Sequence, residues 1–237
     1  MQLILSKFKM SLTKIIFVSL VSTSIILIAD SSVKNILLVG DSISILYAPY
    51  LKEYIDDCFN LRLKGNQSDA IINLDNPKGA NAGNSRMILD YLKHFKETDV
   101  NFNDDIILLN CGLHDIKTDP ISNVNAISLS EYKSNLDSIY WIIMQLNKKL
   151  IWVNTTPVND SIHNSKQVGF YRYNKDVENY NSIADSFFTE HNVPIIDLYS
   201  FTKSFPKEAY SDHVHFKPKY AQLQAKYIAE FILNKNY

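Results

Sequence analysis

The sequence predicts a three-layer α/β/α sandwich built on a five-stranded parallel sheet. Two observations support this fold class. Five short, almost wholly apolar runs alternate with segments of helical spacing, as expected for strands buried on both faces and joined by helical crossovers. The chain also has no internal repeat and no shift in composition that would mark a second folded domain.

The first half of the chain supplies the first three strands. Each apolar run is short and is bounded by a polar residue or a glycine, which is typical of a buried parallel strand. The intervening segments place apolar residues on one helical face, and Asn84 or Ser85 is a good N-cap for the second helix. The expected strands are residues 36–39, 61–63 and 106–109, and the expected helices are residues 43–58 and 85–95, with a polar loop through Gly79.

The second half of the chain continues the alternation. Glu131 near the start of the third helix and Lys148 near its end suit the helix dipole. Pro157 stops the fourth strand, and Pro194 lies within the fifth. The expected helices are residues 130–148, 176–191 and 218–233, and the expected strands are residues 150–153 and 193–198.

The first 31 residues are predicted to be a targeting segment, followed by one domain over residues 32–237. Lys7, Lys9 and Lys14 precede an uncharged apolar stretch at residues 15–29. This stretch suits a signal peptide better than a membrane span, which needs about 20 apolar residues. A signal peptide or a retained N-terminal membrane anchor is therefore expected. Either one predicts an exported protein: periplasmic, secreted, or membrane-anchored and facing outside.

Composition and charge exclude several functional classes. The 237 residues carry 24 Lys and Arg against 25 Asp and Glu, and the formal net charge is −1. A nucleic-acid binder is not expected, because proteins that bind along the phosphate backbone of a nucleic acid usually carry a surplus of Lys and Arg. Only two cysteines are present, too few for a disulfide scaffold or a four-cysteine zinc site. With the leader and its three lysines gone, the domain is mildly acidic, so membrane attachment is expected only through the N-terminal segment.

Chemically useful residues follow the expected strands, where ligands bind in open parallel sheets. Gly40-Asp41-Ser42 follows the first strand, at a sharp strand-to-helix turn that exposes the serine hydroxyl. Asp212 and His215 lie three positions apart, just before the last helix. A serine, a histidine within hydrogen-bond reach and a carboxylate that orients the histidine are the components of nucleophilic catalysis.

These residues resemble the SGNH (GDSL-like) hydrolase family. Gly40-Asp41-Ser42 is similar to the first motif of the family, and Asp212-x-x-His215 is similar to the last. Gly112-Leu113-His114-Asp115 resembles its G-x-N-D block, and Asn81-Ala82-Gly83-Asn84-Ser85 supplies the single glycine of the remaining block. The motifs occur in the family's order over residues 35–233. The resemblance implies a flavodoxin-like sheet.

The resemblance also implies a role for each matching residue. Ser42 would be the nucleophile, His215 the general base, and Asp212 the residue that orients His215. The backbone N–H groups of Ser42 and Gly83, together with a side-chain donor at His114, would form the oxyanion hole. Similar enzymes need no cofactor and no metal, so neither is expected.

Two positions in this assignment stay open. His114 stands where the family has asparagine, and a neutral histidine donates from only one ring nitrogen. Asp115 or a nearby backbone group is expected to fix the required tautomer. Gly79 is the alternative to Gly83, which is preferred because it directly precedes the helix cap.

Other catalytic chemistries are less well supported. His213 and His215, with Asp212 and His114, form a possible metal cluster, but this leaves the exposed serine unexplained. An α/β-hydrolase needs glycine two positions after the serine, where Ser44 stands.

The cysteines are expected to be core residues. Cys111 follows a buried strand and Cys58 ends a helix, so both are predicted to be small buried side chains. Cys111 is a weak alternative nucleophile. Whether the two cysteines pair is left open.

The preferred function is an exported serine esterase that removes an acetyl or other short acyl group from a glycan or a small molecule. An acyltransferase with the same residues and a non-catalytic binding module are the alternatives. The expected partner is the ester substrate, and the oligomeric state is not predicted. The loops at residues 65–83, 112–129 and 158–174 should shape the pocket. Residues 170–173 would either contact the substrate or pack on the protein itself.

Overall fold

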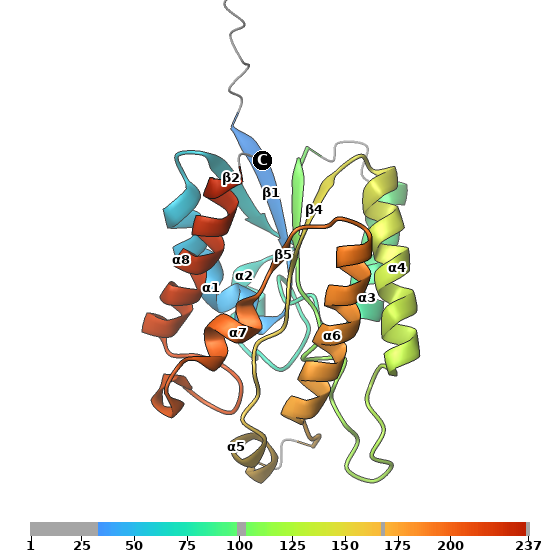
Figure 1. Ribbon diagram of the computed structural model, residues 1–237, viewed down its shortest axis with the longest axis vertical. Helices are drawn as coiled ribbons and strands as arrows, with labels where there is room; N and C mark the ends of the chain where they lie inside the picture. Colours follow the sequence, from blue (N-terminus) through green and yellow to red (C-terminus); the bar gives the residue numbers. More distant parts are fainter. Residues whose placement is uncertain (1–32, 99–102, 167–168, 236–237) are drawn as a thin grey trace, which may run out of the picture. The chain divides into compact units, whose positions relative to one another are not determined.

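The computed structural model describes residues 33–98, 103–166 and 169–235 (Figure 1). The predicted leader, and with it the proposed boundary at residue 31, lies outside the described residues. The region from Val33 onward forms one compact unit. Within these ranges, no helix is both long enough and apolar enough to cross a membrane.

A single five-stranded parallel sheet lies at the centre of this region (Figure 1). The strand order is β2-β1-β3-β4-β5, which is the flavodoxin-like order and confirms the predicted fold class. Every neighbouring pair of strands is parallel. The strands are β1 (Lys34–Val39), β2 (Phe59–Leu63), β3 (Ile106–Leu109), β4 (Lys149–Val153) and β5 (Ile195–Ile196).

Helices cover both faces of the sheet, as Figure 1 shows. On one face α1 packs against α8, and on the other α4 packs against both α3 and α6. Three shorter helices and a 3₁₀ turn lie in the connections. The long helices are α1 (Ser42–Ile55), α3 (Ser85–Thr98), α4 (Leu129–Gln145), α6 (Asn174–Glu190) and α8 (Pro218–Asn234); the short ones are α2 (Gln67–Ile71), α5 (Asp160–Ser165), α7 (Leu198–Lys203) and η1 (Lys207–Ala209).

The central strands are buried because their side chains face helices on both sides. All four residues of β3 and the last four of both β1 and β4 are buried. Trp152 in β4 is fully buried and its ring packs on that of Phe188 from α6. Removal of this apolar surface from water is the main stabilising contribution to the fold.

The short helices were not predicted, because they lack the apolar periodicity that marks a packed helix. Helix α2 has five residues, of which only Ala70 is buried. It is started instead by Asn66, whose side chain accepts a hydrogen bond from the Ser68 N–H at 3.0 Å. The fifth strand is shorter than expected, with two residues in place of six.

Candidate active site

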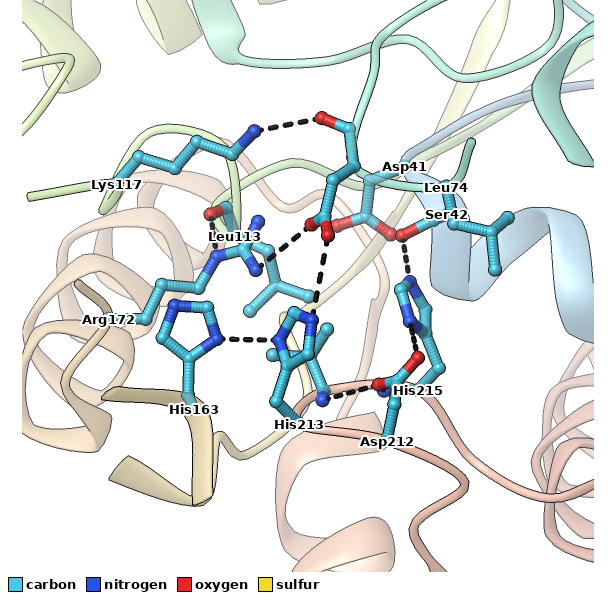
Figure 2. Close-up of polar contacts among 12 residues, drawn as sticks. Asp41, Ser42, Leu74, Leu113, Lys117, His163, Arg172, Asp212, His213 and His215 are labelled. Atoms are coloured by element: carbon cyan, nitrogen blue, oxygen red, sulfur yellow. Dashed lines mark hydrogen bonds and ion pairs between the residues drawn. The ribbon is translucent and has the colours of Figure 1, made fainter. Parts of the chain in front are cut away.

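Ser42, His215 and Asp212 are hydrogen-bonded in series (Figure 2). The Nε2 atom of His215 lies 2.7 Å from the Ser42 Oγ atom, and its Nδ1 atom lies 2.7 Å from Asp212 Oδ2. A carboxylate only accepts, so the Nδ1–H of His215 donates to Asp212 and Nε2 is left to accept the serine proton. The structure thus brings together the three side chains that the sequence singled out.

The start of α1 positions Ser42. Ser42 is the first residue of the helix, and the preceding Asp41 is its N-cap, accepting a hydrogen bond from the Ile43 N–H at 2.9 Å. The N–H groups of the first helical turn have no acceptor within the helix. The Ser42 N–H therefore points out of the helix end, where the dipole favours negative charge.

A tight turn in residues 211–215 positions Asp212 against His215. Asp212 Oδ1 accepts hydrogen bonds from the backbone N–H groups of Val214, at 2.9 Å, and His215, at 2.8 Å. Burial raises the pKa of Asp212, but its hydrogen bond to His215 and these backbone donors outweigh burial, and the net pKa is lowered. Asp212 is thus ionised at neutral pH and fixes the orientation of the imidazole.

Gly83 lies close to the Ser42 turn. The Ala82 N–H donates to the Gly40 carbonyl at 2.9 Å, which places the following residue beside the turn that carries Ser42. Gly83 has a φ of +73°, a conformation that favours glycine. Its own N–H donates to Asn81 Oδ1 at 3.1 Å, so a substrate oxygen would share or replace this acceptor. The alternative, Gly79, packs against Asn66 and α2.

His114 is buried, with 4% of its surface exposed. Burial, aided by the positive charges of Lys117 and Arg172, lowers its pKa well below the ordinary value. The ring is therefore neutral over the whole physiological range and carries one N–H donor. A neutral ring with one N–H can donate to the oxyanion, which is the role expected of the asparagine that the family has at this position.

Asp115 is one of the two groups expected to fix the His114 tautomer, but its carboxyl group makes no hydrogen bond to His114 among the described residues. Its Oδ1 atom accepts a hydrogen bond from the Ser85 N–H at 2.9 Å, so the carboxylate supports the start of α3 instead. Its Oδ2 atom is buried without a hydrogen-bond partner in the described structure. Burial raises the pKa of Asp115 to about 7.

Asp75, Arg172 and His213 form a polar cluster that sequence reasoning did not identify; Arg172 and His213 are labelled in Figure 2. The Nη1 atom of Arg172 lies 3.4 Å from Asp75 Oδ1, and the Nε2 atom of His213 lies 3.5 Å from Asp75 Oδ2. Arg172 belongs to residues 170–173, for which the sequence predicts either contact with the substrate or packing on the protein. It is 1% exposed, so it packs on the protein. No spacing rule in the sequence connects these three residues.

Neither a metal cluster nor a disulfide accompanies the site. Across the three described ranges, no group of three or more His, Cys, Asp or Glu side chains could hold a metal ion. Both cysteines are free thiols. Cys111 is buried as expected, but the prediction for Cys58 was wrong: it is exposed, because it follows α1 in the turn before β2.

Comparison with known proteins identifies the family and supports the fold. The family model "GDSL-like Lipase/Acylhydrolase" matches residues 36–228, whereas a search of curated proteins finds no match. A lipase/acylhydrolase from Enterococcus faecalis is 18% identical, with a TM-score of 0.63 over 85% of this chain and 96% of the other. An acetyl xylan esterase is 15% identical, with a TM-score of 0.61 over 84% of this chain and 99% of the other.

A carbohydrate acetylesterase from Sinorhizobium meliloti is 11% identical, with a TM-score of 0.57 over 85% of this chain and 99% of the other. At these identities the structural matches establish the fold. The match of the family model over most of the chain establishes the family. The chain belongs to the GDSL-like lipase/acylhydrolase family and is an ester-hydrolysing enzyme.

Proposed function

We propose that this protein is an exported serine esterase that removes acetyl or other short acyl groups from a glycan or a small-molecule ester. The observation that carries the proposal is the hydrogen-bonded series Ser42–His215–Asp212. It supplies a nucleophile, a base and an orienting carboxylate at the carboxyl edge of the sheet, where open α/β proteins bind ligands.

The reaction proceeds through an acyl-enzyme. Ser42 Oγ attacks the ester carbonyl carbon while His215 Nε2 takes the hydroxyl proton, and the ionised Asp212 stabilises the imidazolium that forms. The tetrahedral intermediate then collapses, the ester C–O bond breaks, and the departing alkoxide takes the proton from His215. Water attacks the acyl-serine with the same help from His215, and the carboxylic acid leaves.

Negative charge on the carbonyl oxygen is stabilised by the donors around the Ser42 turn. The Ser42 N–H lies at the open end of α1, and the neutral His114 supplies a side-chain N–H. Gly83 contributes its backbone N–H by exchanging Asn81 Oδ1 for the substrate oxygen. A donor that is already in place, such as the Ser42 N–H, acts strongly because it needs no reorganisation during the reaction, whereas the Gly83 N–H must first leave Asn81.

Several observations support the substrate class and location. Ser42 is 3% exposed and His215 is 2% exposed, which favours a small acyl group. Two of the structural neighbours are named as acetyl xylan and carbohydrate acetylesterases. The N-terminal lysines and the apolar stretch of residues 15–29 support export, by a cleaved leader or a retained anchor.

The test is labelling with a fluorophosphonate probe together with hydrolysis of nitrophenyl acetate, measured on the parent, Ser42→Ala and Ser138→Ala. Ser138 is a half-buried serine on α4, a helix that carries none of the proposed catalytic residues, and is the control. Label and turnover in the parent and in Ser138→Ala, with both lost in Ser42→Ala, would support the proposal. A folded parent that takes no label would contradict it.

Two further experiments test the rest of the proposal. Hydrolysis rates on acetylated sugars and on longer nitrophenyl esters identify the acyl preference, and cell fractionation tests export.

A further inference from the structure

Asp75 connects three loops around the site. Its backbone carbonyl accepts a hydrogen bond from Lys117 Nζ at 2.9 Å, and its carboxylate faces Arg172 at 3.4 Å and His213 at 3.5 Å. Lys117, Arg172 and His213, which are labelled in Figure 2, come from different segments of the chain. Asp75 itself lies in the loop between α2 and α3, so a single residue ties that loop to the others.

Arg172 links Asp75 to the segment that carries His114. Besides its contact with Asp75, Arg172 donates from Nε to the carbonyl of Leu113 at 2.8 Å. Leu113 immediately precedes His114, so the guanidinium holds the peptide group that sets where the His114 ring lies. A buried cation of this kind is stable only with a paired anion, and that anion is Asp75.

His213 links Asp75 to the segment that carries His215. A carboxylate oxygen only accepts, so His213 donates from Nε2 to Asp75. The opposite side of the His213 ring is held by His163, with 2.6 Å between the two Nδ1 atoms. The rings of His213 and His215 have centroids 6.1 Å apart, within one short segment. Fixing His213 from both sides therefore restricts the segment that presents His215 to Ser42.

The protonation states of Asp75 and His163 are consistent with these contacts. Burial raises the pKa of Asp75, but the hydrogen bond from His213 and the charge of Arg172 outweigh burial, so the net pKa is lowered. Asp75 thus remains an anion at working pH. Burial lowers the pKa of His163 to about 4, so this ring is neutral and takes part as a hydrogen-bonding partner.

We propose that Asp75 is a positioning residue for ester hydrolysis. Its carboxylate lies between Arg172 and His213, and through them it holds His114 and His215 at the positions from which they act together with Ser42. The role rests on the proposed function, since it acts through residues assigned there. Asp75 does not react with the substrate, so its loss should change the rate of the chemical step more than it changes binding.

The test compares Asp75→Asn with the parent in nitrophenyl acetate hydrolysis. We expect kcat to fall at least about tenfold with KM changed less than about twofold, because a displacement of about 1 Å among reacting groups costs up to about 100-fold. Arg172→Gln should lower kcat similarly. The double variant should lose no more than the worse single variant, since both changes break the same contact.

Asp104→Asn is the control for general loss of stability. Asp104 is a buried carboxylate paired with Arg62 just before β3, at the opposite end of the strands from Ser42. Its loss should lower the melting temperature and leave kcat unchanged. If Asp75→Asn does not fold, His213→Gln serves in its place, with a kcat loss of several-fold expected.

Four results would overturn the proposal. The first three are parental kcat in Asp75→Asn or its substitute, a rise in KM alone, and an equal fall of kcat in the Asp104→Asn control. The fourth is multiplicative losses in the double variant. None of these four results involves a Ser42 variant, so each can occur while the proposed function stands. If instead Ser42→Ala keeps the parental activity, the proposed function itself has failed.

Discussion

The Nε2 atom of His215 lies 2.7 Å from the Oγ atom of Ser42, although the two residues are 173 positions apart. The contact forms because Ser42 begins α1 just after β1 ends at Val39, and the turn before α8 returns to the same edge of the sheet. Helix α8 packs against α1, which fixes the distance between the two ends of the contact.

Replacing Asp212 by asparagine should lower kcat/KM for nitrophenyl acetate by about 100-fold or more. The amide cannot favour the Nδ1–H tautomer or stabilise the imidazolium, although it still fits the turn. Asp90→Asn, at an exposed position on α3, is the matched control and should retain the parental value. An Asp212→Asn variant as active as this control would remove Asp212 from the mechanism.

His114→Asn should keep activity, whereas His114→Ala should lose at least about tenfold in kcat, because only the alanine lacks an N–H donor for the oxyanion. The neutral state of the buried ring makes the asparagine a fair substitute. Steady-state kinetics on both variants provide the measurement. Equal rates for His114→Ala and the parent would show that the ring plays no part in oxyanion stabilisation.

Asp115 should make the protein less stable as the pH rises from about 4 to about 7. Its pKa is raised from 3.8 to about 7 on folding, so within this window the folded state binds the proton more tightly than the unfolded state does. Asp115→Asn removes the titration. The free energy of unfolding of this variant, relative to the parent, should increase by on the order of 2 kcal/mol between pH 5 and pH 7.

Urea unfolding at the two pH values measures this difference. Asp90→Asn should show the pH dependence of the parent. A parallel pH dependence in Asp115→Asn and the parent would mean that the Asp115 carboxyl group is not the titrating group. The absolute stability of the variant is not diagnostic, because the new amide nitrogen is buried where Oδ2 has no partner.

Gly83→Ala should destabilise the fold more than Gly169→Ala. Both glycines have positive φ, at +73° and +87°, so both variants incur a backbone cost of about 1–2 kcal/mol. At Gly83 the new Cβ would also lie 2.8 Å from Pro77 Cβ, whereas Gly169 has nothing within 4 Å. Overpacking adds about 1–3 kcal/mol. Similar unfolding midpoints in urea for the two variants would show that the loop around Gly83 adjusts freely.

The sequence by itself determined the parallel sheet, because fully apolar runs such as residues 106–109 are stable only when buried on both faces. It also located Ser42, Asp212 and His215, since each lies in a short local motif next to a strand end or a helix start. The burial of Cys111 followed from the same local pattern. The exposure of Cys58 did not, because the pattern does not show which helix end faces water.

The partners of the ionisable side chains around the site could not be predicted from the sequence and follow from the packing of the whole domain. Asp75, Arg172 and His213 come from three separate loops, and nothing in the local sequence of any one indicates the other two. Asp115 likewise bonds to Ser85, 30 positions away, and not to its neighbour His114. Periodicity and capping depend on residues a few positions apart and can be read along the chain. The pairing of buried ions depends on which loops the packed sheet and helices bring together, and this is settled only when the whole domain folds.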